Sequence, residues 1–136
     1  MSTAEVLLHT LRQQGTKDTA HDEPDSPLSN YKRIRQQSLK LCKELETEDF
    51  ELQADAFVSP IKWHLAHTSW FFETFILKNT PNYQVFHPQF EYLFNSYYNA
   101  VGEQYPRDKR GLMSRPTVQE VKAYRHYVDQ RLHQLL

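Results

Sequence analysis

The chain has 136 residues, the length of one domain, and its 39% hydrophobic and 24% charged residues are typical of a globular protein. Sixteen lysines and arginines against seventeen aspartates and glutamates give a formal net charge of -1, which argues against a general nucleic-acid or membrane-surface binder. The single cysteine, Cys42, excludes an intramolecular disulfide framework and a CxxC metal site. No apolar run is long enough to cross a bilayer and no signal peptide is evident, so we expect a cytoplasmic protein.

The N-terminal segment separates from the rest by composition. Residues 2–14 could form a short helix, whereas residues 15–26 are polar, contain Pro24 and offer almost nothing to bury. We therefore predict a flexible tail over residues 1–26 and a folded domain over residues 27–136.

The folded domain is predicted to start near Pro27, and its first long helix has Ser29 as a candidate N-cap. Its apolar stripe, at three- and four-residue spacing, comprises Tyr31, Ile34, Ser38, Leu41 and Leu45. The basic residues on the opposite face are expected to be solvated; they are Lys32, Arg33, Arg35, Lys40 and Lys43.

A second long helix is predicted to follow Ser59-Pro60, a pair suited to the N-cap and first position of a helix, and to run to about Lys78. This helix is apolar nearly all round, which places it in the middle of a bundle. Within it, only His64 and His67 are suited to metal chemistry. A histidine on such a helix is more commonly a hydrogen-bonded core residue than a ligand.

The remaining elements are a short helix through Phe90, Leu93, Phe94 and Tyr97, a loop, and a last helix. Thr117 and Glu120 have the spacing of a capping box at the start of that helix. Its apolar face comprises Val118, Val121, Tyr124, Val128, Leu132 and Leu135, and Arg125 and Asp129 are expected to pair one turn apart.

The predicted fold is all-α, with three long helices and a short one. The last helix reaches Leu136 with its apolar face still continuing and with no stop signal, whereas a helix bundle commonly has four helices. Either two chains pair to complete the core or the domain is truncated, and we favour truncation. In a monomer, a stripe of Val121, Val128, Leu132 and Leu135 would be exposed and would favour self-association.

Four motifs in order, WHLAHTSWFFE, LFNSYY, RGLMSRP and YRHYVD, resemble the N-terminal DinB-like region of the ergothioneine-synthase family, the non-haem-iron sulfoxide synthases called EgtB. The resemblance covers roughly residues 28–136. It implies an incomplete up-down DinB-like helix bundle that, in the family, precedes a larger catalytic domain. The implied reaction is oxygen-dependent C–S bond formation between a thiol, such as cysteine or γ-glutamylcysteine, and trimethylhistidine.

The resemblance also implies site residues. Three histidines hold iron in the family, and the one in the motif matched by HLAHT corresponds to His67, with His64 as the alternative. The other two ligands belong to an HxxxHxE motif that this sequence lacks, so we expect Fe(II) to bind weakly or not at all, and no catalytic residue is assigned. A family pair of arginines that contacts the thiol substrate's carboxylates corresponds to Arg107 and Arg110.

Three functions remain open at this point. In the first, the chain is the N-terminal part of such an oxygenase and is inactive on its own. In the second, it is a non-catalytic helical module that self-associates or binds a partner through its C-terminal helix. In the third, which is less favoured, it is a thiol-dependent metalloenzyme assembled by dimerisation. His126 and His133 could then approach a metal, although a surface location is favoured for both. Arg107, Lys109 and Arg110 could equally form only a solvated loop.

Overall fold

The computed structural model describes residues 25–136, and this part of the chain is helical with no β-strand. Its long helices are α2 (Pro27–Leu41), α3 (Ile61–Phe75) and α5 (Val118–Leu135). Shorter elements connect them; they are the 3-10 helices η1 (Thr47–Glu51), η2 (Leu77–Asn79) and η3 (Arg107–Leu112), and the helix α4 (Phe90–Phe94). The all-α prediction, with three long helices and a short one, is confirmed for these residues. The predicted helix over residues 2–14 and nearly all of the predicted tail lie outside the described residues.

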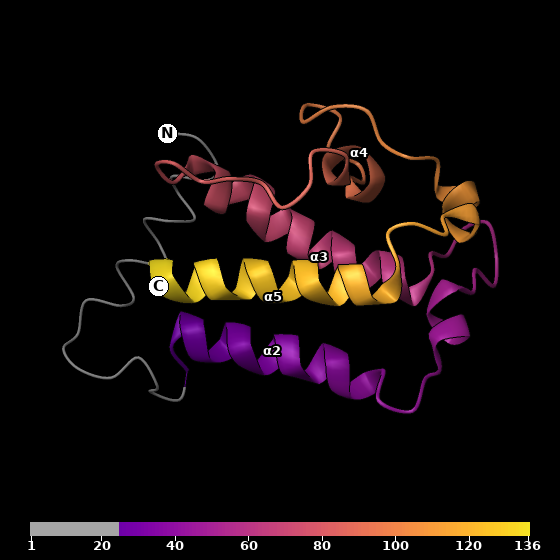
Figure 1. The fold of residues 1–136 in the computed structure, drawn as a ribbon, viewed down its shortest axis with the longest axis horizontal. Helices are drawn as coiled ribbons and strands as arrows, with labels where there is room; N and C mark the ends of the chain where they lie inside the picture. The colour runs from indigo at the N-terminus through magenta and orange to yellow at the C-terminus, as the bar shows by residue number, and fades with distance from the viewer. Residues whose placement is uncertain (1–24) are drawn as a thin grey trace.

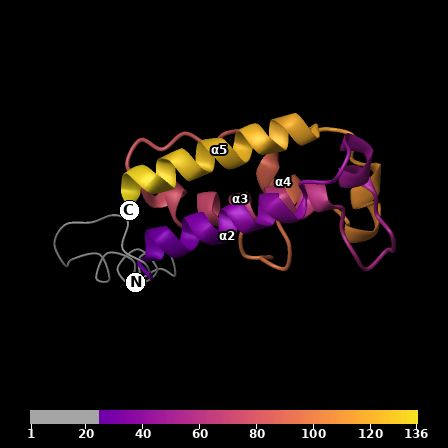
Figure 2. The same ribbon diagram turned by 90° about the horizontal axis from the view of Figure 1, so that it is seen from below.

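α3 is the central element of the bundle. It packs against α5, α4, η1 and η2, as the mostly apolar sequence of this helix predicts. α2 lies alongside α5 and runs in the opposite direction (Figure 1), and in the view of Figure 2 α3 lies behind both helices. None of the helices within residues 25–136 is long and apolar enough to span a membrane.

α5 forms its predicted apolar face. Thr117 caps the helix, because its hydroxyl accepts from the Glu120 amide at 3.2 Å while the Glu120 carboxylate accepts from the Thr117 amide at 2.6 Å. The buried residues of this face are Val118, Val121, Tyr124, Val128 and Leu132. The expected exposure of Val121, Val128 and Leu132 is therefore wrong, because α3 and the segment around Phe86 and Phe90 cover this side of the helix.

α2 departs most from its predicted pattern. Its N-cap is Ser26, not Ser29, and the Ser26 hydroxyl accepts from the Ser29 amide at 3.0 Å. The buried residues of the helix are Leu28, Tyr31 and Arg35, whereas Ile34 and Leu41 are 54% and 79% exposed. The hydrophobic stripe therefore points partly to solvent, and an arginine predicted to be solvated points to the core.

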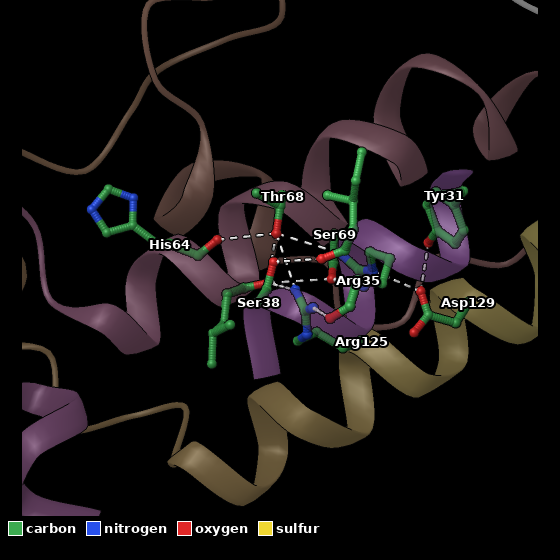
Figure 3. Close-up of polar contacts among 10 residues, drawn as sticks. Tyr31, Arg35, Ser38, His64, Thr68, Ser69, Arg125 and Asp129 are labelled. Carbon is green, nitrogen blue, oxygen red and sulfur yellow. Dashed lines mark hydrogen bonds and ion pairs between the residues drawn. The ribbon is translucent and has the colours of Figure 1, made fainter. Parts of the chain in front are cut away.

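A polar network explains the burial of Arg35 (Figure 3). Its Nε lies 2.8 Å from the Asp129 carboxylate of α5, and its NH2 donates to Ser69 Oγ of α3 at 2.7 Å. The predicted pairing of Asp129 with Arg125 is not formed; the Arg125 guanidinium instead donates to Leu65 O at 3.0 Å and to Thr68 Oγ1 at 3.1 Å. This network links all three long helices, and paired charges can be buried where single ones cannot.

The helices α3 and α4 are shorter than predicted. α3 begins after Pro60 without a side-chain cap and ends at Phe75, and η2 replaces the last predicted turn. Ser59 does not cap the helix, and its hydroxyl accepts a hydrogen bond from Arg110 instead. α4 stops before Tyr97, which has a positive φ of 61°.

Candidate functional site

The three residues assigned by resemblance lie in one pocket. His67, Arg107 and Arg110 line a cavity of about 490 Å³, here called the His67 pocket. Its full lining is Phe57, Val58, Ser59, Trp63, His64, His67, Ser96, Tyr97, Tyr98, Arg107 and Arg110. The structure thus brings the predicted histidine from α3 together with the predicted arginines from η3.

Gln53 fixes η3 in place. Its side-chain amide donates to Arg107 O at 2.8 Å and to Val58 O at 2.9 Å, and its carbonyl accepts from the Gly111 amide at 2.6 Å. A Cβ atom at Gly111 would lie 2.7 Å from Gln53 Cβ, so only glycine allows this approach. The segment that carries both arginines is therefore held by one side chain from the loop after η1.

His67 has one ring nitrogen engaged and one left over. Its Nδ1 lies 2.6 Å from Phe94 O, and because a carbonyl only accepts, Nδ1 carries the proton and Nε2 keeps its lone pair. Burial lowers the pKa of His67, and the positive charge of Arg110 lowers it further, although the bond to Phe94 opposes both effects. A neutral imidazole whose second nitrogen is held by a backbone carbonyl is the state in which histidine binds metals.

His64 lines the same pocket but is less constrained. Its side chain is exposed, and its ring meets Trp63 edge-on at 5.4 Å. Burial of part of the ring lowers the pKa of His64, and Arg110 adds to this effect. A backbone hydrogen bond with Ser59 opposes this lowering, so both histidines of the pocket have a backbone partner, and His67 differs in being the less exposed of the two.

Arg110 is a buried cation, not part of a solvated loop. Its side chain is 3% exposed, and NH1 donates to Ser59 Oγ at 2.8 Å. Burial lowers the pKa of Arg110 to about 10, with a smaller contribution from Arg107. Its Nε is buried without a hydrogen-bond partner, and within residues 25–136 no carboxylate forms an ion pair with it.

Arg107 lies at the open side of the pocket. Its guanidinium carbon is 4.6 Å from the centroid of the Tyr97 ring, and its NH2 donates to the Tyr97 hydroxyl. Arg107 is half-buried and Lys109 is exposed, so η3 presents two of its three basic residues to the pocket and one to solvent. Two guanidinium groups in one pocket, with no carboxylate partner among residues 25–136, are suited to hold an anion.

Trp63 contacts both His67 and Arg110. The His67 ring stacks on it at 4.5 Å with an interplanar angle of 13°, and the Arg110 guanidinium carbon lies 3.6 Å from its centroid. Two planar groups cannot share one face of an indole at these distances, so the two side chains lie on opposite faces. The Trp63 Nε1 donates to Leu93 O at 3.0 Å, which fixes the ring.

Sequence reasoning missed Trp63 and Ser59 as parts of the site. Trp63 lies in the helix predicted to be apolar and central, and it is 4% exposed; no sequence pattern distinguishes a core indole from one that also contacts a histidine and an arginine. Ser59 was expected to cap α3. The local sequence favours that reading, and only the distant Arg110 overrides it.

The residues of this pocket do not complete a metal centre. Within the part of the chain that the structure describes, no group of three histidine, cysteine, aspartate or glutamate side chains is arranged to hold a metal. His126 and His133 are exposed on α5 and do not line the pocket. His67 offers one neutral nitrogen of the kind that binds metals, and residues 25–136 do not arrange two further ligands beside it.

Comparison with known proteins agrees with the helical architecture. The profile of the DinB superfamily matches residues 30–136. No curated protein matches the chain. The match covers most of the chain, including all of α3, η3 and α5, and the chain belongs to the DinB superfamily.

Proposed function

We propose that this chain is the DinB-like part of an iron(II)-dependent sulfoxide synthase of the ergothioneine type. The observation that carries the proposal is the convergence of His67, Arg107 and Arg110 on one pocket, from segments that are distant in sequence. These are the positions at which the resemblance expects a metal ligand and two substrate-binding cations.

The arginines supply recognition of the thiol substrate. Arg110 is buried, is held by Ser59 and Trp63, and has no carboxylate partner, so a ligand carboxylate would replace a missing counter-charge. Arg107 can turn from Tyr97 toward a second carboxylate, because its side chain is only half-buried. Cysteine has one carboxylate and γ-glutamylcysteine has two.

His67 supplies a neutral nitrogen on the opposite side of Trp63 from Arg110. In this arrangement the carboxylate end of a bound thiol lies against the arginines and its sulfur extends toward the histidine side. When bound, Fe(II) would supply a Lewis acid with coordination positions open to the thiol and to dioxygen. Residues 25–136 bring no third ligand to His67 and His64, so the proposal requires further ligands from outside these residues.

The proposal is tested by measuring γ-glutamylcysteine binding to the full chain by calorimetry, under reducing conditions and without metal. We expect Arg107→Ala and Arg110→Lys each to weaken binding about tenfold or more, since a charge-assisted bidentate contact is worth roughly 1.5–3 kcal/mol. Arg115→Ala, at an exposed position outside the pocket, is the matched control and should bind as the unaltered chain does. Equal affinity in all four proteins would contradict the proposal.

Truncation has its own test. Sequencing of the source DNA beyond the codon for Leu136 should show an HxxxHxE motif followed by a long second domain. A stop codon at this point, with a native mass near 16.2 kDa, would remove the oxygenase function for this polypeptide.

A second candidate function is self-association as a helical module. The apolar face of α5 is mostly buried and does not support this function. The support comes from α2, on which Ile34 and Leu41 are exposed and could contact a second copy. A neighbouring apolar cavity of about 220 Å³ is lined by Pro27, Tyr31, Ile34, Arg35, Phe72, Leu132 and Leu136. Light scattering after size exclusion tests this candidate: a clean monomer at high concentration would exclude self-association through α2.

A further inference from the structure

A second pocket lies in the groove between α2 and α5, and it shares no residue with the His67 pocket. Its volume is about 390 Å³, within the range of pockets that hold small organic ligands. It is called the α2–α5 pocket here, and its lining is Leu39, Cys42, Lys43, Leu45, Phe50, Lys122, Arg125, His126 and Asp129.

The lining carries an excess of positive charge. Lys43, Lys122 and Arg125 are cations, and Asp129 is the only carboxylate among the lining residues. Asp129 is already engaged, because Arg35 Nε lies 2.8 Å from it and the Tyr31 hydroxyl donates to the same oxygen. Asp129 is thus shared with Arg35, and among residues 25–136 neither Lys122 nor Arg125 has a carboxylate within ion-pair distance.

Arg125 is the buried member of this set (Figure 3). Its side chain is 3% exposed, and its NH1 and NH2 donate only to neutral oxygens, those of Leu65, Thr68 and Arg35. Its Nε is buried and has no hydrogen-bond partner among the described residues. Burial lowers the pKa of Arg125 to about 10, and the nearby charge of Arg35 adds to the effect. A buried guanidinium without a carboxylate of its own is costly, and an anion in the adjoining pocket would reduce that cost.

Apart from His126, the rest of the lining is apolar. Leu39, Leu45 and Phe50 line the pocket together with the Cys42 side chain, and the Lys122 ammonium lies 5.2 Å from the centroid of the Phe50 ring. At the rim, Lys43 meets Glu44 at 4.0 Å, but both side chains are largely exposed, so this pair contributes little and can reorient. An inorganic anion would leave the apolar lining unused.

We propose that the α2–α5 pocket binds a small monocarboxylate with a short aliphatic chain. The carboxylate lies against Lys122 and the buried Arg125, and the aliphatic chain packs on Phe50 and Leu45. This site is separate from the thiol site proposed above and does not depend on it.

Cys42 provides a local readout, because it lines this pocket and is the single cysteine of the chain. The rate of Cys42 alkylation by iodoacetamide, a neutral reagent, would be measured on the full chain at low ionic strength with increasing hexanoate. Only molecules with an empty site react, so hexanoate at ten times its dissociation constant should slow alkylation about tenfold. Hexanamide has the same chain without the charge and should give little protection.

Variants separate a specific site from general electrostatics. Lys122→Glu should abolish protection by hexanoate, whereas Lys40→Glu, the same charge change at an exposed α2 position outside the lining, should retain it. Arg107→Ala should also retain it, because that residue belongs to the His67 pocket. Three results would overturn the proposal: no protection by hexanoate, equal protection by hexanamide or inorganic phosphate, or full protection in Lys122→Glu. None of them bears on γ-glutamylcysteine binding.

Discussion

His67 and Arg110 occupy opposite faces of one indole, with the imidazole 4.5 Å and the guanidinium carbon 3.6 Å from the centroid of Trp63. The proposed metal ligand and the buried substrate-binding cation are thus positioned by the same side chain. The position of either group depends on that ring.

The first prediction concerns Trp63. Trp63→Leu removes both stacking faces, so we expect γ-glutamylcysteine affinity to fall about thirtyfold, since an aromatic-cation contact in a desolvated site is worth about 2 kcal/mol. Trp63→Phe keeps an aromatic face and loses the bond to Leu93, and it should retain most of the affinity. Calorimetry measures the affinity, and circular dichroism checks that both variants are folded. Equal affinities in the two variants would show that the ring is only core.

The second prediction uses the close approach of Gly111 to Gln53. Gly111→Ala places a Cβ 2.7 Å from Gln53 Cβ, so η3 must move and both arginines move with it. We expect weaker γ-glutamylcysteine binding with little change in the midpoint of thermal unfolding, because the glycine is exposed at the edge of the fold. Binding unchanged in this variant would mean that the position of η3 does not matter to the site.

The third prediction concerns the ion pair between Arg35 and Asp129. Their side chains are 7% and 26% exposed, and Asp129→Ala would leave Arg35 buried next to Arg125 without a counter-charge. The free energy of unfolding should fall by about 3 kcal/mol, measured by urea denaturation. Glu91→Ala is the control, since it removes the more exposed pair with Lys78, whose contribution is about 0–1 kcal/mol. Similar losses in the two variants would contradict a structural role for the buried network.

This network marks the limit of what the sequence could predict. The capping box at Thr117 and the apolar face of α5 follow from local spacing, and both are confirmed. Local spacing failed on α2, where it assigned Ile34 to the core and Arg35 to solvent. The reason is that the partner of Arg35 is 94 residues away, and a single sequence does not reveal which carboxylate will compensate a buried charge.

In the candidate site, too, the sequence predicted some residues and missed others. His67, Arg107 and Arg110 were found because their motifs resemble those of a known family, and they do line one pocket. Gln53 carried no motif, and its role depends on bonds across the fold to Arg107 and Gly111. Residues that position a site through tertiary contacts leave no periodic signal in one sequence.

The fourth prediction follows from the buried Glu73. Its carboxyl is 2% exposed, and burial raises its pKa, although hydrogen bonds from the Tyr83 hydroxyl at 2.8 Å and the Phe86 amide at 3.4 Å partly oppose this. A raised pKa means that the folded state binds a proton at a higher pH than the unfolded state does. Stability should therefore decrease as the pH rises from the unfolded-state pKa through the folded-state pKa.

Glu73→Gln should remove this slope, because the amide is neutral throughout and can still accept from Tyr83. The free energy of unfolding would be measured across the acidic and neutral range for the variant and for the unaltered chain. Glu44→Gln, at a side chain that is 89% exposed, is the matched control and should keep the slope. A slope that survives in Glu73→Gln would assign the pH dependence to another group.

The last prediction concerns iron. His67 offers one neutral nitrogen, and no third ligand is arranged near it and His64 within residues 25–136, so Fe(II) should bind this chain weakly or not at all. Anaerobic titration followed by calorimetry measures the affinity, with His67→Ala as the comparison. The expected result is the same weak heat in both proteins, because one or two histidines do not form a three-histidine site. Stoichiometric binding at micromolar affinity that is lost in His67→Ala would contradict this prediction and would show that the protein assembles a metal centre with ligands beyond residues 25–136 of one copy.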